Sequence, residues 1–154
     1  MTNQTLGSSF TAIALLMLVA GAGIPVMAAL NANLGQHIAN PVAASAILFA
    51  LGCLVSTLIL FVVGVPPASA FRGVSPWVFT AALMVAFYLI SITWSAPRIG
   101  VGNAVFFVLL GQLVAAAAID HWGLFGAVQS SMTWKRALGL LVMALGVYLA
   151  KKSR

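Results

Sequence analysis

The chain has 154 residues, of which 63% are hydrophobic and only 5% are charged, whereas soluble domains carry charge at roughly 25% of their positions. This composition excludes a soluble globular domain and predicts an all-α, multi-pass integral membrane protein. The net charge of +6 does not indicate a nucleic-acid partner, because the seven Lys and Arg residues stand singly or in pairs beside the apolar stretches.

Five apolar stretches, each close to the length of about 20 residues that crosses a bilayer, predict five transmembrane helices in one domain over residues 1–154. The connections between these stretches are short, so we expect the lipid bilayer to surround most of the chain. The predicted spans are residues 10–34, 41–63, 77–96, 101–119 and 134–150.

The first span contains a proline and ends near two asparagines. No Lys or Arg precedes it, and its apolar core exceeds the roughly 7–15 residues of a signal peptide, so we expect it to be retained. Pro25 predicts a break or kink inside a bundle, where neighbouring helices satisfy the freed carbonyls. Asn31 and Asn33 lie about 200° apart around a helix, so we expect Asn33 to line a pathway and Asn31 to cap the broken end. The alternative places both residues at the water interface where the span stops.

The second span starts at Asn40-Pro41, an N-cap residue followed by the position where a helix accepts proline without losing a hydrogen bond. Small residues such as Gly52 recur along it at helical spacing and predict close packing against another helix. Ser45 or Ser56 on the same faces is an alternative lining of a cavity.

The third span ends in a group of polar and aromatic side chains. Tyr88 and Ser91 fall on one side, and Trp94 lies beside Ser91 one turn later, so hydroxyls and an indole N–H reach the same volume. This chemistry suits a small polar solute. The alternative is an interfacial Trp94 with serines bonded to their own helix. Residues 97–100, which begin with Pro97, predict a tight turn into the fourth span.

The fourth span carries Gln112 near its middle, the one amide at that depth among the five spans. An unpaired amide there is costly, so we expect a partner from protein, water or substrate. Gly111, Ala115 and Ala118 form a small-residue stripe beside it, which is typical of a helix contact. Asp120, the single carboxylate side chain of the sequence, closes the span.

The last part of the chain is an amphipathic segment followed by the fifth span. Residues 121–133 predict a loop that lies in the membrane interface. In the fifth span, Gly139, Met143 and Gly146 repeat at near-heptad spacing and indicate a helix contact between subunits.

The charges on the two sides of this predicted topology nearly balance. One side carries three cations and the other carries four, a difference too small to fix the orientation by the positive-inside rule. We therefore expect insertion in both orientations and pairing as an antiparallel, inverted homodimer of ten helices. The alternative is one orientation fixed by the basic C-terminal tail. The cations are Arg72, Lys135 and Arg136 on one side, and Arg98, Lys151, Lys152 and Arg154 on the other.

Three long segments carry a resemblance to a known family. They read PVMAALNANLGQHIANPVAASAILFALG at residues 25–52, APRIGVGNAVFFVLLGQLVAAAAIDHWGLFG at 96–126 and RALGLLVMALGVYLAKK at 136–152. They resemble the YdcZ-like, five-helix proteins of the bacterial inner membrane, which belong to the drug/metabolite transporter superfamily. The resemblance implies an exporter whose relatives exist as single chains, oppositely oriented pairs or ten-helix fusions. The residues at recurrent family positions are Pro25, Asn31, Pro41, Pro97, Gly111, Gln112 and Asp120.

Small multidrug exporters of the same superfamily carry a glutamate in the first helix for proton exchange. This sequence has no acid in its first span, so it departs from that pattern. Asp120 is the remaining candidate for coupling. An enzyme is not expected, because one carboxylate and two His residues form no recognisable nucleophile or metal set.

We expect a small-solute transporter that exports a small polar or organic solute by alternating access, with no cofactor and no metal. The alternatives are a passive channel lined by the same polar stripes and a membrane assembly subunit without transport activity. The expected substrate contacts are Asn33, Tyr88, Ser91, Trp94 and Gln112, and the expected helix-breaking or gating positions are Pro25, Asn31, Pro41 and Pro97.

The class of solute stays open at this point. A site without buried charge favours neutral or zwitterionic polar solutes, or weakly hydrated cations attracted to the rings of Trp94 and Tyr88. Arg98 side chains near the mouths would instead admit anions.

Overall fold

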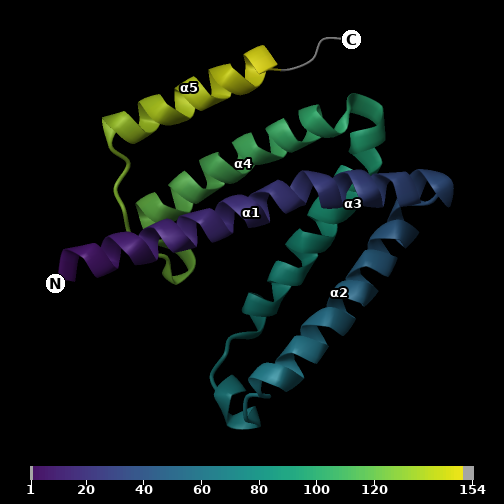
Figure 1. Cartoon of the computed structure of the whole chain (residues 1–154), viewed down its shortest axis with the longest axis horizontal. Coiled ribbons are helices and arrows are strands. Elements are labelled where there is room, and N and C mark those ends of the chain that lie inside the picture. The colour runs from purple at the N-terminus through teal and green to yellow at the C-terminus, as the bar shows by residue number, and fades with distance from the viewer. Residues whose placement is uncertain (1, 151–154) are drawn as a thin grey trace. The chain divides into compact units, whose positions relative to one another are not determined.

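The computed structural model describes residues 2–150, which fold into α-helices, short 3-10 helices and loops (Figure 1). No β-strand occurs among these residues, which confirms the all-helical prediction. The chain divides into two compact units, with the boundary between Arg98 and Ile99. The α-helices are α1 (Thr2–His37), α2 (Pro41–Val63), α3 (Ala81–Ile99), α4 (Val101–Trp122) and α5 (Trp134–Ala150), and the 3-10 helices are η1 (Ala68–Phe71), η2 (Pro76–Thr80) and η3 (Leu124–Gly126).

Four of the described helical segments are long and apolar enough to cross a membrane. Large hydrophobic side chains such as Leu51, Phe61 and Phe107 are exposed along them, so these helices contact the lipid bilayer. The helix α5 has 17 described residues, at the lower limit of about 17 residues for a spanning helix, and the fifth span stays a prediction. The four segments are Phe10–His37, Pro41–Val63, Pro76–Ile99 and Val101–Trp122.

The helix α1 runs without interruption through Pro25, so the predicted break at Pro25 and Asn31 is wrong. Proline removes only the one bond that its N–H would make to the carbonyl of Gly21, and the flexible backbone of a glycine lets that carbonyl move away from the ring. In the continuous helix the two asparagines face different directions, because Asn31 is buried and Asn33 is exposed.

The start of α2 is the one predicted from its first residues. Asn40 has extended backbone angles, and its Oδ1 accepts hydrogen bonds from the N–H groups of Val42 at 3.1 Å and Ala43 at 3.0 Å. Pro41 occupies the first helical position, where a missing N–H removes no intrahelical bond. Pro41 therefore starts a helix and does not break one.

The core of the first unit lies where α2 and α3 reach the C-terminal third of α1 (Figure 1). Gly35 marks the closest approach, because a Cβ added there would lie 3.1 Å from Cγ2 of Thr93 and 3.2 Å from Cα of Pro41. Beyond this core α2 is exposed on every side from residue 50 to residue 63. A Cβ added at Gly52 would meet no atom within 4 Å, so the packing predicted for this small residue is not made within the described chain. The buried residues of the unit are Ala28, Asn31, Ala32, Gly35, Ala44, Ser45, Leu89, Ile92, Thr93 and Ala96.

The helix α3 continues past its predicted end. The tight turn expected at residues 97–100 is wrong, because Pro97 lies inside the last turn of α3 and Gly100 alone separates α3 from α4. Gly100 has a φ of 88°, a conformation that side chains other than glycine rarely adopt. The missing N–H of Pro97 leaves only the carbonyl of Thr93 without its usual helical donor.

In the second unit α4 extends past its predicted end at Ile119 to Trp122. Gly123 closes the helix in a left-handed conformation and donates its N–H to the carbonyl of Ile119. The small residues Gly111 and Ala115 are exposed, so the helix contact predicted for them is not made within this unit. The helix α5 has the bounds that the fifth apolar stretch predicts.

Candidate functional site

Three polar side chains from three helices meet in the core of the first unit. Asn31 on α1, Ser45 on α2 and Thr93 on α3 are 3%, 1% and 2% exposed. The Nδ2 amide of Asn31 donates a hydrogen bond of 2.6 Å to Oγ1 of Thr93, which in turn donates to the carbonyl of Leu89 at 2.7 Å. Oγ of Ser45 lies 2.9 Å from the carbonyl of Pro41 and 3.5 Å from Oγ1 of Thr93, and its single proton goes to the nearer oxygen.

Only one of these side chains depends on another helix for its hydrogen bond. The hydroxyls of Ser45 and Thr93 each bond to a carbonyl of their own helix, so they need no partner from another helix. The amide of Asn31 instead reaches across to α3, and removing that partner would leave a buried donor unsatisfied. Asn31 therefore fixes α1 against α3.

A cavity of about 650 Å³ lies beside this cluster, and Thr93 belongs to both. Its volume falls within the range of about 300–1,000 Å³ that is usual for ligand sites. It lies at the end of the unit where α1 turns into α2 and where α3 ends. The lining residues are Gly35, Gln36, Ala39, Pro41, Thr93, Trp94, Pro97 and Arg98.

The charged and aromatic groups of the cavity form one pair. The Cζ atom of Arg98 lies 4.0 Å from the centroid of the Trp94 ring, a cation–π contact. Nη1 of Arg98 also donates a hydrogen bond to the backbone carbonyl of Trp94. The guanidinium is therefore held both by the ring and by the last turn of its own helix.

The predicted substrate contacts of the first unit are distributed over several surfaces. Trp94 lines the cavity, whereas Asn33 and Ser91 are exposed outside it. Oγ of Ser95 donates a hydrogen bond of 2.7 Å to the carbonyl of Ser91, so the side chain of Ser95 bonds to its own helix, as the alternative interpretation expects of serines at this end of the span. The hydroxyl of Tyr88 is buried and has no hydrogen-bond partner among the described residues.

Sequence reasoning missed Thr93, which is central to both the cluster and the cavity. A signal was present, because Leu89, Ile92, Thr93 and Ala96 are spaced so that they share one face of a helix, and all four are buried. A threonine among three apolar residues of a buried face indicates a polar contact in the core. Gln36 and Gly35 gave no comparable signal, since they line the cavity only because of how α1 meets the other two helices.

Gln112 lies on the surface of α4. Within residues 99–149 its amide makes no hydrogen bond, so its predicted partner does not come from its own unit. In a bilayer an amide facing lipid is costly, so this position requires a polar group from elsewhere.

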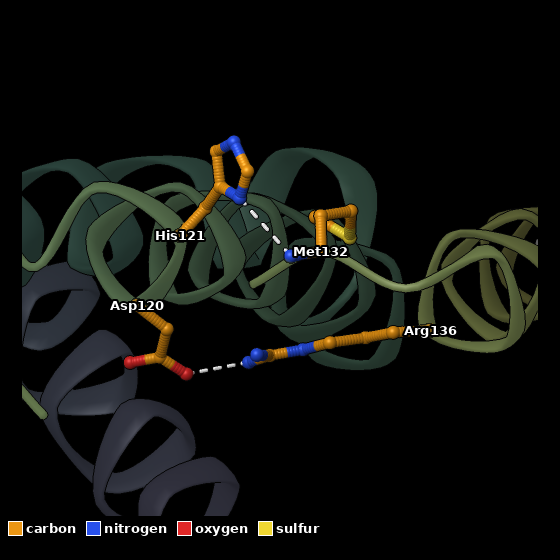
Figure 2. A network of polar contacts seen from close by, with 4 residues as sticks. All are labelled: Asp120, His121, Met132 and Arg136. Carbon is orange, nitrogen blue, oxygen red and sulfur yellow. Dashed lines mark hydrogen bonds and ion pairs between the residues drawn. The ribbon is translucent and has the colours of Figure 1, made fainter. Parts of the chain in front are cut away.

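Asp120 and His121 tie the end of α4 to the start of α5 (Figure 2). Oδ2 of Asp120 lies 2.5 Å from Nη2 of Arg136, and both side chains are about one third exposed, at 36% and 34%. Nδ1 of His121 accepts a hydrogen bond of 3.0 Å from the backbone N–H of Met132. The backbone of the loop is held as well, because the N–H of Ser130 donates to the carbonyl of Asp120 at 2.8 Å. This arrangement gives Asp120 a structural partner.

A second cavity, of about 260 Å³, lies between α4 and α5. Its wall is mainly aromatic and aliphatic, and Nδ2 of Asn103, one of its few polar groups, already donates to the carbonyl of Ile99 at 2.8 Å. Gly139 and Gly146, predicted to contact another helix, are exposed and outside this cavity. The second cavity therefore suits a polar solute less well than the first. Its lining residues are Asn103, Phe106, Phe107, Leu110, Ala144, Val147 and Tyr148.

Within residues 2–150 no three His, Cys, Asp or Glu side chains gather where they would hold a metal ion.

Comparison with known proteins identifies the family of the chain. Comparison with curated proteins and with solved structures gives no match. The model of the family described as "Putative inner membrane exporter, YdcZ" matches residues 12–149. Because this match covers nearly the whole chain, the protein belongs to the YdcZ family of inner-membrane exporters and is a multi-pass membrane transport protein.

Proposed function

We propose that the protein is a small-solute exporter that works by alternating access as an antiparallel homodimer of ten helices. The observation that supports this most is the cavity beside the Asn31–Thr93 contact, whose lining joins hydroxyl, amide and guanidinium groups. Polar groups within membrane helices are costly, and where they face a cavity they commonly mark a solute pathway.

The packing of the first unit suits a site around which helices move. Its buried residues gather beside the cavity, whereas α2 beyond residue 50 is exposed on every side. Helices that are joined at one end can swing at the other while the joined end keeps its contacts. Alternating access requires this kind of gating around a fixed site.

Two exposed features support a second copy of the chain as partner. Gln112 is an exposed amide in the middle of a membrane-competent helix, and a polar cavity formed with another copy would satisfy it. Gly52 and Ser56 on α2 are exposed small residues, which allow the backbones of two helices to approach closely.

The antiparallel arrangement is supported by the charges. With five spans, three cations lie on one side and four on the other, so neither orientation is strongly favoured. Two copies inserted in opposite orientations form an inverted pair, which presents the same cavity to each side of the membrane.

Proton exchange through an acid in α1 is not part of this proposal, because α1 contains no Asp or Glu. A catalytic function is not proposed either, since the single carboxylate side chain, Asp120, is paired with Arg136. We interpret the Asp120–Arg136 pair as a structural tie between α4 and α5.

Cysteine accessibility tests the arrangement. In a Cys53→Ser background, Gln36→Cys places one thiol in the cavity lining, and a membrane-impermeant maleimide is added to intact cells and to inverted vesicles. We expect labelling in both preparations, because an alternating site opens to each side in turn and oppositely oriented copies open it to both sides. The Cys53→Ser protein, which has no thiol, is the labelling control. Labelling from one side alone contradicts the antiparallel dimer.

A further inference from the structure

We propose that the cavity recognises a small organic anion, a carboxylate or phosphate attached to a compact apolar body, through the Arg98 guanidinium held on the Trp94 ring. This assignment names the substrate class of the cavity and rests on its proposed function as the transport site. Both side chains line the cavity, and the Cζ atom of Arg98 lies 4.0 Å from the ring centroid of Trp94.

The Asp and Glu side chains of the sequence leave no carboxylate for Arg98. The sequence has one Asp or Glu side chain, Asp120, and that carboxylate lies 2.5 Å from Nη2 of Arg136. A second copy of the chain would add one more carboxylate side chain, its own Asp120, which would be paired with its own Arg136. Arg98 is exposed at the cavity, and a guanidinium beside a low-dielectric membrane attracts an anion, so a bound ligand can supply its counter-ion.

The guanidinium is oriented before any ligand arrives. The cation–π contact with Trp94 and the bond from Nη1 to the Trp94 carbonyl hold the guanidinium at two points. Of the five N–H donors of an arginine, this bond uses one, and the planar fork of the remaining donors matches the two oxygens of a carboxylate or phosphate. Such prior orientation lowers the entropy lost on binding.

The same pair disfavours a cation as substrate. A weakly hydrated cation would be drawn to the face of Trp94, but the guanidinium of Arg98 already occupies a face of that ring. A second positive charge in the cavity would be repelled by Arg98. Of the solutes that the sequence left open, weakly hydrated cations are therefore less favourable than anions.

The rest of the lining describes the body of the ligand. Ala39, Pro41 and Pro97 present apolar surface, and the cavity of about 650 Å³ has room for a compact organic group. Gln36 adds an exposed amide, which can bond to polar substituents, whereas the hydroxyl of Thr93 is already bonded to Asn31 and Leu89. An apolar body with one anionic group fits both parts of this lining.

Three probes of matched size test the charge preference: benzoate, benzamide and benzylammonium. Each is titrated against the full chain in nanodiscs of zwitterionic phosphatidylcholine, with binding followed by ligand-observed NMR. We expect benzoate to bind at least about tenfold more tightly than the other two, because a charge-assisted bidentate contact is worth at least that factor. Arg98→Gln should remove this preference. Arg72→Gln is the matched control, since Arg72 lies in the same unit but outside the cavity lining.

Anionic lipid carries the same chemistry as a soluble anion, so a second arm separates the two sources. The titration is repeated in nanodiscs that contain phosphatidylglycerol. Benzoate binding in phosphatidylcholine that weakens as phosphatidylglycerol is added supports a soluble anion at a site that a headgroup can also enter. Stabilisation by phosphatidylglycerol that depends on Arg98, without benzoate binding in phosphatidylcholine, assigns the site to a lipid headgroup and overturns the inference.

Folding controls keep the test decisive. If Arg98→Gln loses its thermal transition, Arg98→Lys takes its place. The lysine keeps the charge but loses the bidentate fork, so we expect weaker benzoate binding in a folded protein.

Equal binding of the three probes, or benzoate binding that a folded Arg98 variant leaves unchanged, overturns the anion assignment. Counterflow of a neutral solute that Arg98→Gln does not alter keeps alternating access and overturns the anion class alone. Benzoate binding that depends on Arg98, without any counterflow, keeps the anion site and contradicts the exporter.

Discussion

The amide of Asn31 on α1 donates a hydrogen bond of 2.6 Å to the hydroxyl of Thr93 on α3, across 62 positions of sequence. Both side chains are buried, at 3% and 2% exposure, and Thr93 also lines the cavity. The contact therefore does two things at once: it fixes the position of α1 against α3, and it holds the cavity lining at Thr93 in place. Changes to Asn31 are expected to alter both the stability of the fold and the shape of the cavity.

Asn31→Ala should lower the free energy of unfolding by about 0.6 kcal/mol and by no more than about 1.7 kcal/mol, the range measured for hydrogen bonds between membrane helices. Thr93→Val should cost more, about 1–3 kcal/mol, because it leaves the buried Asn31 amide without its acceptor. Equilibrium unfolding in mixed micelles measures both values. Asn33→Ala is the matched control, since Asn33 is exposed two positions later on the same helix. A loss of stability at Asn33 equal to that at Asn31 would show that the contact is not what holds α1.

Gly35 is a second point where α1 meets its neighbours. A Cβ at this position would lie 3.1 Å from Thr93 and 3.2 Å from Pro41, and the second of these contacts is with backbone, which cannot rotate away. Gly35→Val should therefore destabilise the protein by about 1–3 kcal/mol, the usual effect of overpacking. Gly23→Val on the same helix is the control, because a Cβ there meets no atom within 4 Å. Similar melting temperatures for the two variants would contradict the close approach of the three helices.

Local chemistry explains which parts of the fold could be predicted from the sequence. The start of α2 was predictable because its signals are local. Asn40 accepts hydrogen bonds from residues two and three positions later, and Pro41 follows it at the first helical position. The end of α3 was not predicted, because Pro97 was assigned to a turn, whereas it removes a single bond from a helix that continues to Ile99. Pro25 likewise leaves α1 continuous.

The candidate site depended on long-range packing, which the sequence does not specify in the same way. The spacing argument correctly indicated that Asn31 and Asn33 face different directions in a continuous helix, but it expected Asn33 to line the pathway, whereas Asn31 is the buried one and Asn33 is exposed. Which asparagine faces inward depends on Thr93, which lies 62 positions away in the sequence. A threonine can also satisfy its hydroxyl within its own helix, as Thr93 does at Leu89, so its presence alone did not indicate a contact with Asn31. The cavity lining also depends on long-range packing, because it combines residues from three helices.

The ion pair between Asp120 and Arg136 should act as a tie and not as a coupling site. Asp120→Asn and Arg136→Gln should each lower the free energy of unfolding by about 0.2–1 kcal/mol, because the pair is partly exposed to solvent. Exchanging the two residues, Asp120→Arg with Arg136→Asp, should recover part of that loss. Thermal unfolding measures stability, and counterflow measures transport in the same variants. Abolished counterflow in a folded Asp120→Asn protein would assign coupling to Asp120 instead.

Cross-linking on α2 distinguishes antiparallel from parallel pairs. Ala46 and Thr57 are exposed on the face of α2 that carries Cys53, near the middle of the helix. In a Cys53→Ser background, antiparallel helices that cross at their centres bring Ala46→Cys of one copy close to Thr57→Cys of the other. Two copies of Ala46→Cys stay about 16 Å apart in that arrangement, given a rise of about 1.5 Å per residue. We expect a short bismaleimide to join the mixed pair and not the identical pair, whereas the reverse result indicates parallel chains.

The central claim is that the cavity beside Asn31 and Thr93 carries solute by alternating access, and counterflow in proteoliposomes tests it most directly. Purified protein is reconstituted with a panel of radiolabelled sugars, amino acids, organic cations and organic anions. The account predicts saturable uptake of at least one solute, accelerated by the same unlabelled solute on the opposite side, because an alternating site exchanges more readily than it returns empty. Non-saturable passage of the whole panel without exchange would contradict it and indicate a pore, and the absence of any flux would indicate an assembly subunit.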